Sequence, residues 1–216
     1  MARGTASNKV IEFPLKKIQQ KSPVTGGSPP SSSTLSVNGV RLGVLLFIGS
    51  EAMLFSGLLA VYTAFRFGNP IWPSAHLYLP VRVTWVNTFF LLLSCYTMHR
   101  AIVVGKAGNQ QKLIILLGST AWLGTLFLCI QGYEWIQLIH DGLTITTGIY
   151  GATFYLLIGT HALHVLVAVI WLLIVTWLAM KGRFPATRFV GVEVCGMYWY
   201  FVGGLWVVLF ALVYLN

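Results

Sequence analysis

Two histidines, His161 and His164, lie three positions apart in the segment GTHALHV at residues 159–165. From Gly148 to Met180 the chain contains no Lys, Arg, Asp or Glu, so both imidazoles lie in an apolar environment. Imidazoles can bind a metal, relay protons or hydrogen-bond between helices. Residues at positions i and i+3 share one face of a helix, so we expect both rings to address the same interior.

Carboxylates are scarce, and most of them lie inside or close to apolar segments. A carboxylate in lipid is costly enough that it turns inward to a partner or becomes protonated. At about 1.5 Å per residue, Glu51 lies roughly 13 Å into the first apolar segment. The two histidines lie roughly 20 to 24 Å from the outer end of the fourth by the same rise. We therefore expect a buried polar network that consists of Glu51, His161, His164, Glu134 and Glu193.

Three chemical roles compete for this network. A metal or haem site needs further ligands at matching depth, and no other histidine lies clearly inside an apolar segment. A proton relay through Glu51 and the histidines is chemically possible, since carboxylate–imidazole chains occur in pumps. We favour the third role, an interhelical hydrogen-bond network that fixes helices against one another. In that role Glu51 hydrogen-bonds to a histidine of the fourth segment.

The composition identifies the solvent around these residues as a lipid bilayer. Hydrophobic residues make up 56% of the chain and charged residues only 9%, and the mean hydropathy is +0.77. Apolar stretches of about 20 residues cross a hydrocarbon core about 30 Å thick as helices. The sequence predicts an all-α polytopic membrane protein, a bundle of five transmembrane helices. The predicted spans are 42–66, 82–104, 113–139, 149–180 and 189–215.

Residues 1–38 read as a flexible tail, because the stretch KSPVTGGSPPSSSTLS is rich in Ser, Pro and Gly and has few large apolar side chains. We expect this tail to be cytoplasmic and residues 39–216 to form the transmembrane domain.

The net charge of +9 reflects membrane topology rather than nucleic-acid binding. Only Arg66 and Arg82 flank the opposite ends of the spans. By the positive-inside rule, the N-terminal side is cytoplasmic and the segment ending at Asn216 faces outward. The basic residues on the cytoplasmic side are Arg3, Lys9, Lys16, Lys17, Lys21, Arg41, Arg100, Lys106, Lys112, Lys181, Arg183 and Arg188.

Four segments resemble the cytochrome c oxidase subunit III family, in the family's order. They carry the Ser-Glu-x-x-x-Phe, Asn-Thr-x-x-Leu-Leu-x-Ser and His-x-x-His elements and the closing helix. The segments are SEAMLFSGLLAVYTAF (50–65), VNTFFLLLSCYT (86–97), DGLTITTGIYGATFYLLIGTHALHVLVAVIWL (141–172) and GVEVCGMYWYFVGGLWVVLFALVYL (191–215).

The resemblance implies an accessory subunit of a haem-copper oxidase in the five-helix form, located in a bacterial cytoplasmic membrane. Such subunits hold no haem, copper or catalytic centre, pack against the catalytic subunit I and bind phospholipid. Glu51, His161, His164 and Glu193 match the family's buried glutamate, paired histidines and the glutamate before the last helix. As partners for lipid headgroups we expect the interfacial residues Arg66, Arg82 and Arg188.

Two positions depart from the family pattern Tyr-Trp-His-Phe-x-Asp. Here Tyr200 replaces the histidine and Gly203 replaces the aspartate, so any polar contact that they mediate is altered. The same resemblance is compatible with an accessory subunit of a nitric oxide reductase. A small proton-coupled transporter would also place carboxylates and histidines near the midplane.

Overall fold

The computed structural model describes residues 1, 32–69, 81–184 and 189–215. Its five α-helices are α1 (Ser32–Gly68), α2 (Val81–Lys106), α3 (Gln110–His140), α4 (Ile149–Met180) and α5 (Val190–Val213). All five are long and apolar enough to cross a membrane, which confirms the predicted all-α bundle with five spans.

The helix boundaries follow the predicted spans closely, with one clear difference at the first. Helix α1 begins at Ser32, ahead of the predicted span 42–66 and inside the segment assigned to the tail. Residues 2–31 of that tail, and Arg188, lie outside the described residues. Hydropathy marks only the part of a helix that is apolar, so polar turns that extend it are missed.

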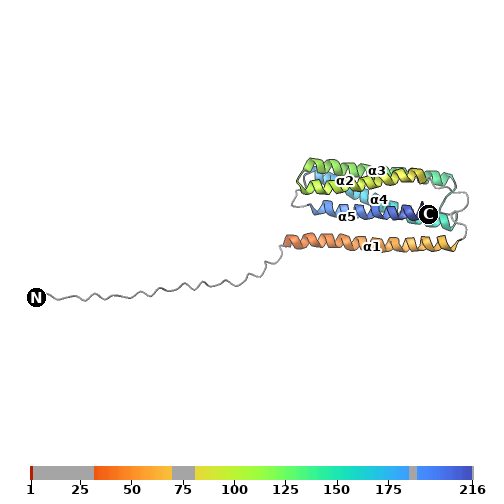
Figure 1. Cartoon of the computed structure of the whole chain (residues 1–216), viewed down its shortest axis with the longest axis horizontal. Coiled ribbons are helices and arrows are strands. Elements are labelled where there is room, and N and C mark those ends of the chain that lie inside the picture. Colours follow the sequence, from red (N-terminus) through yellow and green to blue (C-terminus); the bar gives the residue numbers. More distant parts are fainter. Residues whose placement is uncertain (2–31, 70–80, 185–188, 216) are drawn as a thin grey trace.

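Helices α2 and α3 form an antiparallel hairpin through a short turn (Figure 1). Gly108 takes a φ of 80°, the left-handed conformation that glycine adopts without steric cost. The side chain of Asn109 caps α3 by accepting a hydrogen bond from the backbone N–H of Lys112 at 3.1 Å. Lys106 and Lys112 therefore stay at the same end of the bundle.

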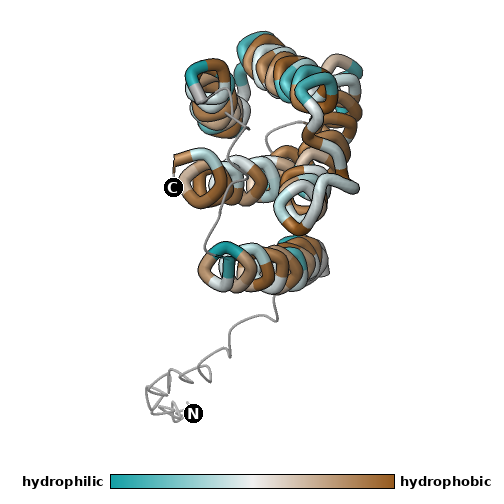
Figure 2. The backbone as a smooth tube through the Cα atoms, turned by 90° about the vertical axis from the view of Figure 1, so that its right-hand side faces the viewer, coloured by the Kyte–Doolittle hydropathy of each residue, from teal (hydrophilic) through white to brown (hydrophobic). Residues whose placement is uncertain are grey.

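Helix α5 is central and α1 is peripheral. In their apolar windows 50% of the residues of α5 are buried but only 6% of those of α1. Helix α5 packs against α1, α2 and α4, whereas α1 packs against α4 and α5. In Figure 1 α1 runs along the lower edge of the bundle, and in the end-on view of Figure 2 hydrophobic residues prevail on every helix, as lipid contact requires.

Two tryptophans of α5 set its position against α2. Trp199 Nε1 donates a hydrogen bond to Ser94 Oγ at 3.1 Å, and Trp206 Nε1 donates one to Thr88 Oγ1 at 2.9 Å. Both indoles are fully buried, so leaving these N–H groups unpaired would be costly. The bonds orient Trp206, whose ring faces α4.

Candidate functional site

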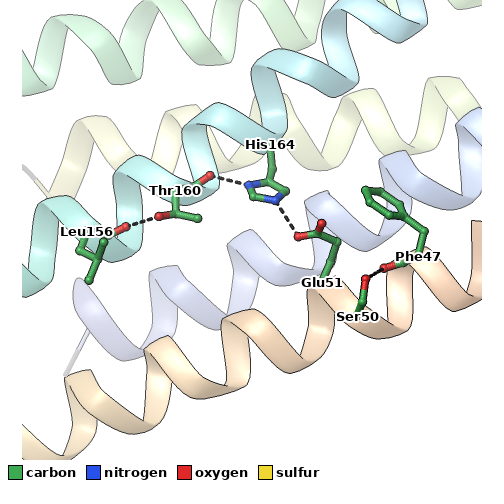
Figure 3. Close-up of polar contacts among 6 residues, drawn as sticks. All are labelled: Phe47, Ser50, Glu51, Leu156, Thr160 and His164. Atoms are coloured by element: carbon green, nitrogen blue, oxygen red, sulfur yellow. Dashed lines mark hydrogen bonds and ion pairs between the residues drawn. The ribbon is translucent and has the colours of Figure 1, made fainter.

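Glu51 of α1 and His164 of α4 form a direct polar contact between these two helices (Figure 3). Glu51 Oε2 lies 2.7 Å from His164 Nε2, and both side chains are about 15% exposed. The other ring nitrogen, Nδ1, lies 2.7 Å from the backbone oxygen of Thr160, one turn earlier on α4. The imidazole is therefore held at both nitrogens.

This geometry limits the hydrogen-bonding roles of the two ring nitrogens. A carbonyl oxygen only accepts, so Nδ1 must donate its hydrogen to Thr160. His164 Nε2 then either accepts a hydrogen from a protonated Glu51 carboxyl, or donates one to a Glu51 carboxylate as part of an imidazolium. In both arrangements a hydrogen bond joins α1 to α4.

His161 is fully buried and lies among aromatic rings. Its ring stacks on Trp206, with centroids 5.3 Å apart and an interplanar angle of 26°. Phe55, one turn after Glu51, packs edge-on against both histidines, 6.2 Å from His161 and 5.1 Å from His164. Neither nitrogen of His161 has a hydrogen-bond partner among the described residues. The two histidines thus share a helix face but have different surroundings.

Glu134 belongs to a second polar cluster, which joins α2, α3 and the end of α5. Its oxygens accept hydrogen bonds from Thr84 Oγ1 at 3.1 Å and Gln131 Nε2 at 3.0 Å. Gln131 Nε2 also lies 3.4 Å from the hydroxyl of Tyr214. Asn87 Nδ2 donates to the backbone oxygen of Phe127 at 3.2 Å and lies 3.5 Å from Gln131 Oε1. This cluster pins the hairpin of α2 and α3 to α5.

Glu193 lies in a third cluster, at the basic end of the bundle. It forms ion pairs with Arg41 of α1 and, at 2.7 Å, with Lys106 Nζ of α2. Both cations are substantially exposed, so each pair contributes at most about 1 kcal/mol. Glu193 therefore connects three helices at the interface instead of joining Glu51 at mid-depth.

The described contacts thus place Glu51 with His164, Glu134 and Glu193 in three separate polar groups, and they give His161 no polar partner. The sequence alone did not indicate Thr84 as a partner of Glu134, nor Asn87 and Tyr214 as partners of Gln131. Only Gln131, one helical turn before Glu134, had a spacing that could have indicated contact. Among the described residues, no group of three His, Cys, Asp or Glu side chains lies close enough to hold a metal.

The interfacial arginines differ in their surroundings. Arg66 Nη1 lies 3.4 Å from the backbone oxygen of Leu212 on α5, whereas Arg82 is exposed at the start of α2. Arg188 was named as a third candidate for headgroup contact and lies outside the described residues.

The departures at Tyr200 and Gly203 have a structural counterpart on α5. A Cβ atom at Gly203 would lie 2.7 Å from Cys95 Sγ of α2, too close for an ordinary contact. The Tyr200 hydroxyl is buried without a hydrogen-bond partner among the described residues. The close approach of α2 and α5 thus depends on a missing side chain at position 203.

The comparisons with known proteins all identify the same family. The family described as cytochrome c oxidase subunit III matches residues 20–216. The chain is 35% identical to cytochrome c oxidase subunit 3 of Synechocystis sp., over 80% of this chain and 74% of the relative. It is 34% identical to the subunit 3 of Bacillus sp. strain PS3, over 87% and 91%, and to that of Bacillus subtilis, over 86% and 90%.

Proposed function

Because the chain belongs to the cytochrome c oxidase subunit III family and is an accessory subunit of a membrane haem-copper oxidase, we propose that it stabilises the catalytic subunit as a non-redox scaffold that holds phospholipid. It is a multi-pass membrane protein, and its partners are other subunits of the oxidase complex. This membership favours the oxidase over the alternatives of a nitric oxide reductase subunit and a small transporter.

The contact between Glu51 and His164 carries the proposal. Helix α1 buries few of its side chains in the bundle, so apolar packing within the chain holds it weakly. In lipid the hydrophobic effect does not drive helices together, and packing and polar contacts do this instead. We propose that the 2.7 Å contact between Glu51 and His164 holds α1 against α4 and fixes the depth of α1 and its rotation about the helix axis. We propose that the catalytic subunit binds a surface that includes α1 in this position.

The same geometry argues against an obligatory proton relay. A relay must pass its proton on from the second nitrogen of the imidazole to another titratable group. In this chain His164 Nδ1 faces the backbone oxygen of Thr160, which hydrogen-bonds but does not take up a proton at physiological pH. His161 does not extend a path for protons, because its ring nitrogens have no hydrogen-bond partner among the described residues. The pair is better suited to fixing helices.

We propose further that the chain itself binds no haem and no transition metal, as the resemblance implies. The redox groups then belong to partner subunits. Metal analysis and haem spectra of the purified chain test this: a stoichiometric metal that disappears in His164→Ala would refute it.

Lipid and location complete the proposal. Guanidinium groups pair well with phosphate, and we propose Arg66, Arg82 and Arg188 as contacts for phospholipid headgroups at their ends of the bundle. The excess of Lys and Arg at the end where α1 begins supports a cytoplasmic segment before α1 and a C-terminal side that faces outward. The location that we propose is a bacterial cytoplasmic membrane, as the resemblance implies.

The central test compares assembly with turnover. We would purify the oxidase complex from cells that express wild-type chain, Glu51→Ala or His164→Ala, and measure retention of this subunit and the initial rate of oxygen consumption on the same preparation. Ser50→Ala is a matched control, since the Ser50 hydroxyl donates only to the carbonyl of Phe47 on its own helix, at 2.7 Å.

We expect both test variants to lose the subunit during purification, with initial turnover per intact complex close to wild type. The control should behave as wild type. An intact complex that is inactive from the first turnover in Glu51→Ala would establish the relay and overturn the scaffold.

A further inference from the structure

A groove with two cationic side chains lies between α2 and α3 at the basic end of the bundle. Its volume is about 300 Å³, and it is lined by Arg100, Val104, Lys112, Ile115 and Leu116. The residues of α2 are four apart and those of α3 are three or four apart, so each helix presents one face to the groove. The groove is separate from the contacts of Glu51, Glu134 and Glu193.

The positive charges in this groove are not neutralised within the described part of the chain. Arg100 and Lys112 are exposed, and neither forms an ion pair with a described residue. Glu193, the acidic residue described at this end, is already paired with Arg41 and Lys106. The groove therefore has an excess of positive charge that an anion from outside the described part of the chain could neutralise.

The depth of the residues indicates what kind of anion fits. Arg100 lies six residues before the end of α2, about 9 Å deep along the helix, while Lys112 lies about 3 Å from the start of α3. Ile115, which is 66% exposed, continues the groove toward the membrane interior with Val104 and Leu116. A long arginine side chain reaches the interface from such a depth while its stem covers apolar surface. The groove thus has two cationic groups near the membrane interface and apolar side chains directly beside them, toward the membrane interior.

We propose that this groove binds one anionic phospholipid of the cytoplasmic leaflet. Its phosphate is held between the Arg100 guanidinium and the Lys112 ammonium, and one acyl chain lies along Val104, Ile115 and Leu116. A lipid with net negative charge fits better than a zwitterionic one, since no acidic side chain lines the groove to receive a positive headgroup. The inference depends on the membrane-spanning fold and not on the scaffold role, while its assignment to the cytoplasmic leaflet rests on the orientation proposed above.

The test uses the full chain in nanodiscs of phosphatidylcholine that contain a minor fraction of phosphatidylglycerol. Native mass spectrometry counts the phosphatidylglycerol molecules that stay bound as that fraction is raised. We compare wild type with Arg100→Gln/Lys112→Gln. The matched control is Lys181→Gln/Arg183→Gln, which removes two charges at the same end, in the connection after α4.

We expect wild type and control to retain one phosphatidylglycerol in preference to phosphatidylcholine. The groove variant should bind it roughly tenfold more weakly or worse, since each interfacial cation contributes about a factor of five. Ile115→Trp keeps both charges and fills the apolar floor, so it should also weaken retention. Arg100→Lys should restore part of it.

Several outcomes would overturn the proposal. Equal losses in the groove variant and the control mean diffuse attraction to the charged end, and retention unchanged by Ile115→Trp means that the groove takes no part. Loss of a partner subunit from the purified oxidase, with lipid retention unaffected, assigns the two cations to a protein contact. Thermal unfolding of each variant shows whether a loss merely reflects misfolding.

Discussion

Glu51 Oε2 of α1 lies 2.7 Å from His164 Nε2 of α4, and Phe55, four residues after Glu51, packs against the same imidazole. One face of α1 thus supplies both a polar and an aromatic contact to α4. The main packing partners of α1 are α4 and α5. Substitutions on this face therefore test which contacts hold α1 in the bundle.

A double-mutant cycle on this pair should reveal direct coupling. Glu51→Ala and His164→Ala each leave a polar partner without its bond, at a cost of about 1–3 kcal/mol in the free energy of unfolding. The double variant should cost less than the sum, by about 0.6 kcal/mol and at most about 1.7, the range found for hydrogen bonds in membranes. Unfolding in mixed micelles measures the cycle. Strict additivity would mean that the two side chains do not share a bond.

His161 should tolerate loss of its nitrogens but not of its ring. His161→Phe keeps an aromatic ring against Trp206 and removes two polar atoms that have no described partner, so its unfolding free energy should stay within about 1 kcal/mol of wild type. His161→Ala should cost about 3 kcal/mol or more through the cavity that it leaves.

His164→Phe is the matched comparison for His161→Phe, because it breaks the bond to Glu51. Thermal melting of the purified complex ranks the variants. If His161→Phe were as damaging as His164→Phe, the nitrogens of His161 would have to bind a group that the chain itself does not supply.

Glu134 should depend on its shape and hydrogen bonds more than on its charge. The contacts described for its oxygens are a hydroxyl and an amide, not a cation. Glu134→Gln keeps the shape and one acceptor and should cost about 1 kcal/mol. Glu134→Ala leaves both donors unpaired around a cavity and should cost about 2–4 kcal/mol. Equal losses in the two variants, measured as unfolding free energies, would show that the carboxylate charge is required.

Gly203 and Gly204 form an internal pair of test and control on α5. Gly203→Ala forces a methyl group against Cys95 Sγ and should destabilise the bundle by about 1–3 kcal/mol. Gly204→Ala meets no atom within 4 Å and should be neutral or stabilise the helix by up to about 1 kcal/mol. Adding Cys95→Ala to Gly203→Ala should recover stability; no recovery would show that the contact with Cys95 is not the cause.

The sequence alone determined that the chain crosses the membrane five times. Unpaired backbone groups are too costly in a hydrocarbon core about 30 Å thick, so each long apolar stretch must be helical. The predicted span 149–180 coincides with α4 (Ile149–Met180), while α1 begins ten residues before its predicted span, where hydropathy no longer identifies a helix. The approach of Glu51 to the histidines also followed from depth, since a rise per residue places side chains along the membrane normal.

Only the tertiary structure decided which histidine pairs with Glu51. His161 and His164 share one face of α4, so spacing along the chain cannot distinguish them. The rotation of α4 about its axis distinguishes them, and that rotation depends on Trp206 of α5, which is held by Thr88 of α2 and stacks on His161. The separation of Glu134 from Glu193 follows instead from depth, because Glu134 lies near the end of α3 and Glu193 in the first turn of α5, at opposite ends of the bundle. A sequence determines the depth of a side chain in a membrane helix, but its neighbour at that depth is set by how all the helices pack together.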